Sequence, residues 1–405
     1  MNIKVLKNFD MAFCAPVNKS MVMAVSEKAE EIIPGSTAQS LFIINPETSE
    51  KAGVAPEIPK FLIDRVSYAS NDRDYVVFPT AQPGADDVLN ITLYYYGLSD
   101  GTLKQLHSFA VDLQDFNKSL FLKVFVLDEE NLIIQSETFT EGVIRPAYRL
   151  KMFDARSGTV KDIRIKELID NGISAMFPLA DNKCVIKAGR AYFPDREYML
   201  KPADLDREFI FIIPVNQFIS ELTIDIDNGF SEIVEESRDN TTLPYIKVSG
   251  TKLIYAVYYV AEGKEEIIIY DTETGKKTIR INSRLKNIND LWHTFVVDGS
   301  PYLVTGSGGA GARVTDLNTQ KTFVRLENGD DIPFVYDDLV VMTGKKKKLF
   351  RDQDYVAVYK FPEIYNNQIA EIKGVYSGSL VNGDDLIIFI ENERGEDNGF
   401  SKDQE

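Results

Sequence analysis

Two adjacent residues of this chain have side chains that often contact ligands. Trp292 and His293 stand side by side in an expected strand, Leu291–Val297, so they face opposite sides of the sheet. One of them is a candidate to line a ligand-binding opening. The alternative is a tryptophan in the core and a histidine bonded to the backbone. With two histidines in the chain, a histidine-rich metal site is excluded, and a Ser-His-Asp triad would have to use one of the two.

A glycine-rich segment lies shortly after this pair. Residues 306–311 read Gly-Ser-Gly-Gly-Ala-Gly, with Gly308 and Gly309 at the centre. Successive backbone amides of such a loop can hold an anion. A phosphate-binding loop, however, needs a helix after it and a lysine at a set offset. Here an expected strand, Arg313–Thr315, follows, so the sequence favours a tight connecting loop over a nucleotide site.

A basic cluster forms the third candidate. Lys345, Lys346, Lys347, Lys348 and Arg351 fall within seven residues of an otherwise acidic chain. Basic clusters bind anionic partners by charge attraction. The hypothesis is that this segment is a loop that docks an acidic partner. The alternative is a solvated loop that offsets local acidity, which is the commoner role of a charge run.

A long insertion between two expected strands, Lys187–Arg207, carries Arg190 and Arg196. Long loops on a rigid scaffold often bind ligands. An acidic segment, Asp225–Gly229, resembles a calcium-binding loop, but its glycine is at the fifth position, whereas such a loop has it at the sixth. The predicted binding residues are therefore Trp292, His293, Gly308, Gly309, Lys345, Lys346, Lys347, Lys348, Arg351, Arg190 and Arg196. No catalytic residue, metal ligand or cofactor is predicted.

The bulk composition limits the partners. The chain has 45 Lys+Arg against 62 Asp+Glu, a net charge of −17. That field repels phosphate backbones, so we expect no nucleic-acid partner. Cys14 and Cys184 are the only cysteines, which excludes a disulfide framework and favours buried, inert thiols. No run is apolar enough to span a membrane, and the first residues lack a signal-peptide core. We expect a cytoplasmic monomer, or an exported protein whose signal segment is absent from this sequence.

The elements that must position these residues repeat along the chain. Eight times, a short turn of mainly Asn, Asp, Gly, Glu or Lys precedes an almost purely apolar run, with a mean spacing of about 52 residues, as in propellers and arrays. The eight runs are Met21–Val25, Tyr75–Phe78, Leu132–Ile134, Cys184–Ile186, Leu253–Val257, Tyr302–Val304, Leu339–Met342 and Leu386–Ile390.

Each unit predicts four antiparallel strands, A to D. A β-rich run such as Leu122–Leu127 precedes the apolar run and forms a hairpin with it. Two further expected strands, C and D, follow each of the first seven hairpins and are joined by a polar turn. An example is the C strand Ile267–Tyr270, a turn beginning at Asp271, and the alternating D strand Lys277–Ile281. The Asp can accept backbone amides of its turn, and the Gly near the turn's end tolerates positive φ. Alternation marks a half-exposed outer strand.

The eighth hairpin is not followed by C and D strands of its own. The chain begins with Asn2–Phe9, which resembles the outer D strands, so we expect this N-terminal strand to complete the C-terminal blade and close the ring. The prediction is an all-β, eight-bladed β-propeller over residues 1–392, followed by an acidic tail, 393–405. Seven blades is the alternative, with the uncertainty at the irregular stretch Asp225–Thr242.

These repeats resemble the β-propeller superfamily in architecture over nearly the whole chain. They carry no WD40 pair, kelch doublet or complete Asp-box. In propellers, as the resemblance implies, ligands meet the face formed by the D–A and B–C connections, or the channel mouth. The favoured prediction is a non-enzymatic module that binds a protein partner or a small ligand on this face. The alternative is a propeller enzyme, a hydrolase or lyase, whose site is assembled from scattered charged residues.

Overall fold

The structure is a computed structural model. It describes residues 1–33, 35–63, 65–85, 88–112, 122–138, 147–165, 172–189, 207–224, 231–238, 240–283, 294–305, 312–326, 330–347, 352–362 and 366–391. Two compact units divide the chain. The first comprises residues 1–29, 39–56 and 292–405, and the second comprises 30–38 and 57–291. A single domain over residues 1–392 therefore stays a prediction, and the predicted tail lies outside the described residues.

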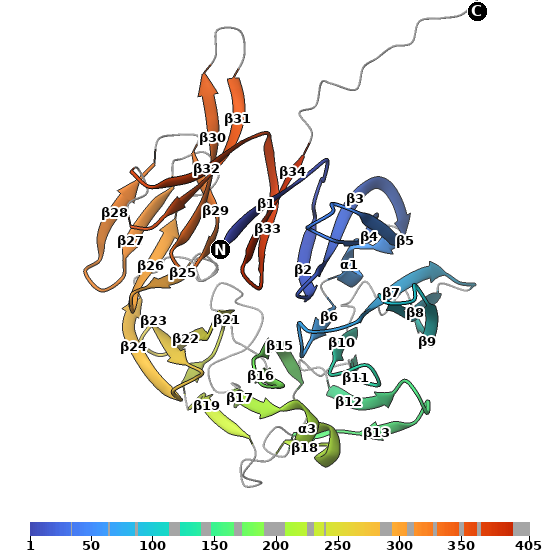
Figure 1. Cartoon of the computed structure of the whole chain (residues 1–405). Coiled ribbons are helices and arrows are strands. Elements are labelled where there is room, and N and C mark those ends of the chain that lie inside the picture. Colours follow the sequence, from blue (N-terminus) through green and yellow to red (C-terminus); the bar gives the residue numbers. More distant parts are fainter. Residues whose placement is uncertain are drawn as a thin grey trace, which may run out of the picture. The chain divides into compact units, whose positions relative to one another are not determined.

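The first unit contains four sheets (Figure 1). Three of them run in sequence order, each with four strands: β2 (Phe13–Asn18), β3 (Met21–Ile33), β4 (Ser36–Ile44) and β5 (Lys51–Pro59); β25 (Thr294–Val297), β26 (Ser300–Thr305), β27 (Arg313–Asp316) and β28 (Lys321–Arg325); and β29 (Asp331–Tyr336), β30 (Leu339–Lys347), β31 (Asp352–Lys360) and β32 (Gln368–Lys373). The first sheet's far hairpin, at residues 30–38, groups with the second unit. The fourth sheet joins both parts of the chain, in the order β33 (Val375–Asn382), β34 (Asp385–Glu391), β1 (Asn2–Lys7).

The second unit contains four further sheets, two short helices and one two-stranded pair within its described residues. The sheets are β7 (Tyr75–Pro83), β8 (Val88–Gly97) and β9 (Leu103–Asp112); β6 (Val66–Tyr68), β10 (Leu122–Val126), β11 (Asn131–Thr138), β12 (Ala147–Asp154) and β13 (Val160–Asp162); β15 (Ile173–Leu179), β16 (Lys183–Ala188), β17 (Phe209–Pro214) and β19 (Glu232–Glu236); and β20 (Thr241–Thr242), β21 (Ile246–Ser249), β22 (Lys252–Tyr259), β23 (Lys264–Asp271) and β24 (Lys276–Ser283). The pair is β14 (Arg164–Ile165) with β18 (Thr223–Ile224), and the helices are α1 (Lys60–Ile63) and α3 (Val215–Glu221).

These sheets are the blades of an all-β β-propeller. Over the described residues they number eight, four in each unit, so the prediction of eight blades is confirmed against the alternative of seven. All eight apolar runs are strands: β3, β7, β11, β16, β22, β26, β30 and β34. Seven of them hold the second, B, position, each paired with the A strand just before it, whereas β7 is the first described strand of its sheet. No described helix is long and apolar enough to cross a membrane.

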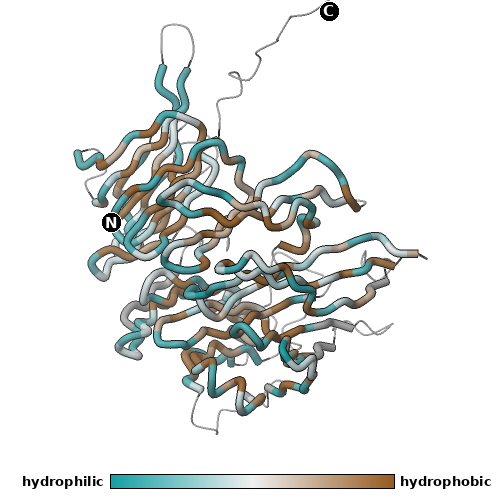
Figure 2. Tube along the Cα trace, turned by 45° about the vertical axis from the view of Figure 1, so that its right-hand side comes forward, coloured by the Kyte–Doolittle hydropathy of each residue, from teal (hydrophilic) through white to brown (hydrophobic). Residues whose placement is uncertain are grey.

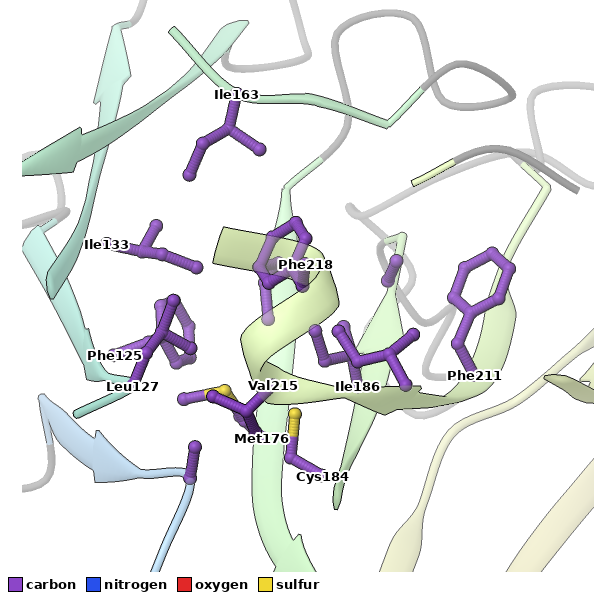
Figure 3. Close-up of a cluster of buried hydrophobic side chains, with 14 of the residues drawn as sticks. Phe125, Leu127, Ile133, Ile163, Met176, Cys184, Ile186, Phe211, Val215 and Phe218 are labelled. Atoms are coloured by element: carbon purple, nitrogen blue, oxygen red, sulfur yellow. The ribbon is translucent and has the colours of Figure 1, made fainter. Parts of the chain in front are cut away.

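The B strands are apolar because neighbouring blades cover both of their faces. In β16, Cys184 packs into one core cluster with Ile186, while Val185 packs into another, and all three are fully buried. Figure 3 shows the first cluster, where Phe218 of α3 meets side chains from two adjacent sheets of the second unit, among them Ile133 and Met176. Burial raises the pKa of the Cys184 thiol to about 12, which fits an inert thiol.

The predicted Asp-Gly turns are confirmed in detail. Asp271 Oδ1 accepts the backbone amides of Glu273 at 3.0 Å and Thr274 at 2.9 Å, and Gly275 takes φ +67°. Asp154 and Asp316 cap their turns in the same way. This local side-chain capping replaces backbone partners that the turn itself leaves unpaired.

The N-terminal strand joins the C-terminal blade, as predicted. β1 pairs in parallel with β34, from Asn2 opposite Asp385 to Lys7 opposite Ile390, and in Figure 1 the blue strand lies against the red one. Its likeness to outer D strands placed it one position too far out. It is the third strand, because its apolar side chains are used on both faces: Ile3 and Val5 pack into one cluster and Leu6 into another.

The outer strands contain a repeated irregularity that alternation did not predict. Among the described residues, five C–D strand pairs carry a β-bulge within one to three residue pairs of their connection, and the extra D-strand residues are Leu106, Val234, Thr278, Phe323 and Ile369. A bulge increases local twist and redirects a side chain. Of these bulge residues, Phe323 and Ile369 are exposed, at 48% and 49%, whereas Val234 is buried.

Candidate functional site

Most of the predicted binding residues fall outside the described residues. These are Trp292, His293, Gly308, Gly309, Lys348, Arg351, Arg190 and Arg196. The acidic segment Asp225–Gly229 also lies outside them. Their roles therefore stay predictions.

The basic segment is not a loop where the structure describes it. Lys345, Lys346 and Lys347 belong to β30, and each stands opposite a residue of β31. Both strands continue here beyond their other pairing partners as a hairpin, whose hydrophilic ends are teal in Figure 2.

Acidic neighbours on adjacent strands face this basic hairpin. Lys345 lies 3.7 Å from Asp354, and Lys346 lies 2.6 Å from Glu371. The hydrogen bond from Lys346 lowers the pKa of the Glu371 carboxyl. The basic run thus has partners within the chain. Sequence reasoning missed them because they come from β31 and β32, after the loop.

The most deeply buried charges of the described chain lie in the second unit. Lys187, near the end of β16, donates to Glu208 Oε1 at 2.8 Å just before β17. The two residues are only 3% and 1% exposed. Burying both charges is unfavourable unless further hydrogen bonds hold them.

Glu208 has those further hydrogen bonds, from the next blade. Its Oε2 accepts the hydroxyl of Thr242 in β20 and the backbone amide of Leu243 at 2.8 Å. Its backbone also exchanges hydrogen bonds with Ser237, whose Oγ accepts the Glu208 amide at 2.7 Å. With both oxygens occupied, the carboxylate has a fixed orientation.

Lys187 contacts Ser174 of its own blade, and Ser174 is hydrogen-bonded to the preceding blade. The Lys187 ammonium lies 3.4 Å from Ser174 Oγ, which in turn donates to the Lys187 carbonyl at 3.1 Å. Half-buried Lys123, from β10, donates to the Ser174 carbonyl at 2.8 Å. We call Lys123, Ser174, Lys187, Glu208 and Thr242 the polar network. It joins three successive blades of the second unit.

The polar network lies where B strands end and C strands begin. Lys187 and Glu208 flank the insertion predicted as a binding loop, whose described ends, Gly189 and Arg207, meet closely. Gly189 takes φ +92°, and a Cβ there would lie 2.8 Å from the Arg207 carbonyl oxygen. The sequence signal was the insertion itself. Nothing near Glu208 in sequence marked it as the partner.

The network has a defined chemical capacity. Glu208 fixes the Lys187 ammonium, and through Ser174 the arrangement places a second, more accessible ammonium, Lys123, at the same end. Preorganised charges in a low-dielectric setting stabilise charge that develops on a substrate. Among the described residues no group of His, Cys, Asp or Glu is arranged to hold a metal ion.

A further lysine of the second unit has a shifted pKa. Burial lowers the pKa of Lys247, in β21, to about 8. It stands near the A–B turn at Ser249, the opposite end of its blade from Thr242. Lys247 is therefore not part of the polar network.

Comparison with known proteins finds similarity in structure but not in sequence. No protein-family model and no curated protein sequence matches the chain. Dipeptidyl peptidase 4 from Porphyromonas gingivalis is similar, with 10% identity, a TM-score of 0.49, and coverage of 89% of this chain and 52% of that one. This chain thus spans about half of that peptidase's length.

Two other similar structures match over nearly their full length. The β-propeller domain of the Trilobed protease from Pyrococcus furiosus has 14% identity and a TM-score of 0.40, with 89% of this chain and 99% of that one covered. Oligogalacturonate lyase from Vibrio parahaemolyticus has 11% identity and a TM-score of 0.39, with 89% and 91% covered.

These comparisons correct the predicted function. A non-enzymatic binding module was favoured, but the similar structures include four peptidases and one lyase, beside an initiation factor and an uncharacterized protein. The enzyme alternative therefore agrees better with them. At these identities and scores the matches do not assign a reaction, and it is the observed strand order that identifies the fold. The chain is an eight-bladed β-propeller over its described residues.

Proposed function

We propose that this chain is an enzyme-type propeller of the hydrolase or lyase class that carries its own active site. The observation that carries the proposal is the buried Lys187–Glu208 pair within the polar network. An apolar pair of similar volume is often as stable as a buried ion pair or more so. A buried charge pair beside a long insertion is therefore better explained by function than by stability.

Roles follow from accessibility. Lys187 and Glu208 are positioning residues, because they are buried and bonded to each other. Lys123 is the more accessible cation and would contact an anionic group of the substrate or an oxyanion formed during reaction. Arg190 and Arg196, in the adjoining insertion, would supply further positive charge. A cytoplasmic location and a monomeric state remain parts of this proposal.

An activity panel with matched variants tests it. The purified full chain is assayed with proline-containing chromogenic peptides and with oligogalacturonate, the substrate classes suggested by the similar enzymes. Lys123→Met should lower kcat/KM by about 10-fold or more, the usual effect of losing one charge-stabilising donor. Lys183→Met is the control, because Lys183 is an exposed lysine at the other end of β16.

Two results would overturn the proposal. One is absence of turnover with every substrate of the panel while circular dichroism confirms a folded protein. The other is equal kcat/KM for the native chain, Lys123→Met and Lys183→Met, which would remove the polar network from the chemistry.

A further inference from the structure

Four aromatic rings of the first unit form a contiguous cluster that extends from the core to the surface, with mostly edge-on contacts. Phe295 and Phe361 are buried, and their centroids lie 5.2 Å apart. Half-buried Tyr302 lies 4.6 Å from Phe361. Phe323, 48% exposed, contacts both, at 5.9 Å from Tyr302 and 5.2 Å from Phe361. We call Tyr302, Phe323 and Phe361 the aromatic ledge.

A β-bulge in the backbone sets the direction of the Phe323 side chain. Phe323 is the extra residue of the bulge between β27 and β28, since Val324 pairs with Val314 and Thr322 pairs with Thr315. Bulges recur where a side chain must be redirected. At the corresponding bulge of the next blade, Ile369 is equally exposed, and no ring contact is found for it among the described residues. The aromatic ledge thus distinguishes this blade from the blade that follows it.

The surroundings of the ledge are acidic. The carboxylates of Asp316 and Asp298 act on the Tyr302 phenol, whose pKa is raised first by burial and then by these charges. Asp298 lies in the A–B turn and Asp316 begins the C–D turn. On the other side, Lys360 is ion-paired with Asp338 at 3.1 Å. Ring faces and carboxylates both attract cations.

We infer that the aromatic ledge, with Asp298 and Asp316, docks an arginine side chain of an extended peptide segment from a partner protein. Guanidinium is planar, weakly hydrated and stacks on aromatic faces while donating to carboxylates. The net charge of −17 favours the approach of a basic partner. This docking surface lies at the turn end of its blade and does not depend on the proposed enzymatic function.

Fluorescence anisotropy on the full chain tests this assignment. The probe is a fluorescein-labelled Gly-Arg-Gly-Arg-Gly peptide, compared with the same peptide carrying Gln in place of Arg. We expect saturable binding of the Arg peptide that weakens as salt rises, since exposed charge attraction is screened. The Gln peptide should not bind measurably.

Three variants locate the binding. Phe323→Ala should raise Kd about two- to fivefold, as expected for a partly exposed cation–π contact, whereas Phe323→Trp should retain or tighten binding. Asp316→Asn should also weaken binding, while its amide oxygen keeps the turn capped. Ile369→Ala removes an equally exposed apolar side chain from the next blade and should leave Kd unchanged.

Three outcomes would overturn the inference. Equal Kd for the native chain and Phe323→Ala would show that the aromatic ledge is not the site. Equal binding of the Gln peptide would indicate a neutral ligand. Self-association abolished by Phe323→Ala in sedimentation velocity, without binding of the Arg peptide, would identify a second copy as the occupant.

Discussion

The Lys187–Glu208 pair allows a quantitative test of how the buried network is held together. In Glu208→Leu, the Lys187 ammonium stays buried without its carboxylate, and the Leu243 amide loses its acceptor. Breaking a buried pair from one side costs about 3–5 kcal/mol. Lys187→Met leaves the Glu208 carboxylate buried without its ammonium and should cost a similar amount.

The double variant, Lys187→Met with Glu208→Leu, should recover most of this loss. Replacing both charges by apolar groups is often neutral or stabilising by about 1–4 kcal/mol. The Leu243 amide remains without its acceptor, which costs about 1–3 kcal/mol. The two effects largely cancel, so we expect the double variant within about 2 kcal/mol of the native chain.

Urea unfolding followed by circular dichroism, with hydrogen exchange of the β16 and β17 peptides, measures these values. The control is the pair Lys346–Glu371, whose side chains are 51% and 33% exposed. Single changes there should cost at most about 1 kcal/mol. The reasoning is refuted if either single change at Lys187 or Glu208 costs less than about 1 kcal/mol, or if the double variant loses the sum of both.

Three further predictions concern titration, closure and strain. The hydrogen bond from Lys252 lowers the pKa of Asp271 to about 2; because this pKa is depressed on folding, its stabilisation is present above about pH 4 and is lost as pH falls toward about 2. Asp271→Asn, which keeps the turn capped, should cost about 1–2 kcal/mol near neutral pH and nothing near pH 2 in urea titrations, and an unchanged difference across this range would contradict it. Deleting residues 1–8 should lower Tm and accelerate hydrogen exchange in β34, since the deletion removes the strand paired with β34 and the buried side chain of Leu6. An unaltered Tm would contradict a stabilising role for this N-terminal strand. Gly189→Ala should destabilise more than Gly158→Ala by thermal unfolding, because both have positive φ but only Gly189 would clash; equal effects would argue against a tight approach there.

Much of the fold could be predicted because each strand is indicated by the residue types within a short segment of sequence. Runs such as Cys184–Ile186 are apolar at every position, which only a strand covered on both faces requires. Turns such as the one beginning at Asp271 are predicted by a capping Asp and a Gly three or four residues later. These signals operate within a few residues and need no knowledge of neighbours.

Strand position within a blade was harder to predict. Asn2–Lys7 alternates like an outer strand, yet it lies third, because the pattern reports which side chains are apolar and not which blades will cover them. The bulge at Phe323 was missed for a similar reason. Alternation in residues 322–326 continues through a backbone that has in fact inserted one extra residue.

The candidate site was predicted only at its edges. The insertion after Ala188 was singled out for its length, but Glu208 and Thr242 were not, since each is an ordinary polar residue in its local sequence. The acidic partners of Lys345 and Lys346 were not predicted, because they come from strands that follow the loop.

The sequence by itself determined the strands, their turns and the number of blades, since apolar periodicity and turn capping are short-range properties. Only the tertiary structure decided which charges meet. Lys187 and Glu208 are 21 residues apart, Glu208 and Thr242 are 34 apart, and Asn2 and Asp385 are 383 apart. Such pairs form because packed blades exclude water and leave a buried charge no other partner, a condition that exists only once the sheets are assembled.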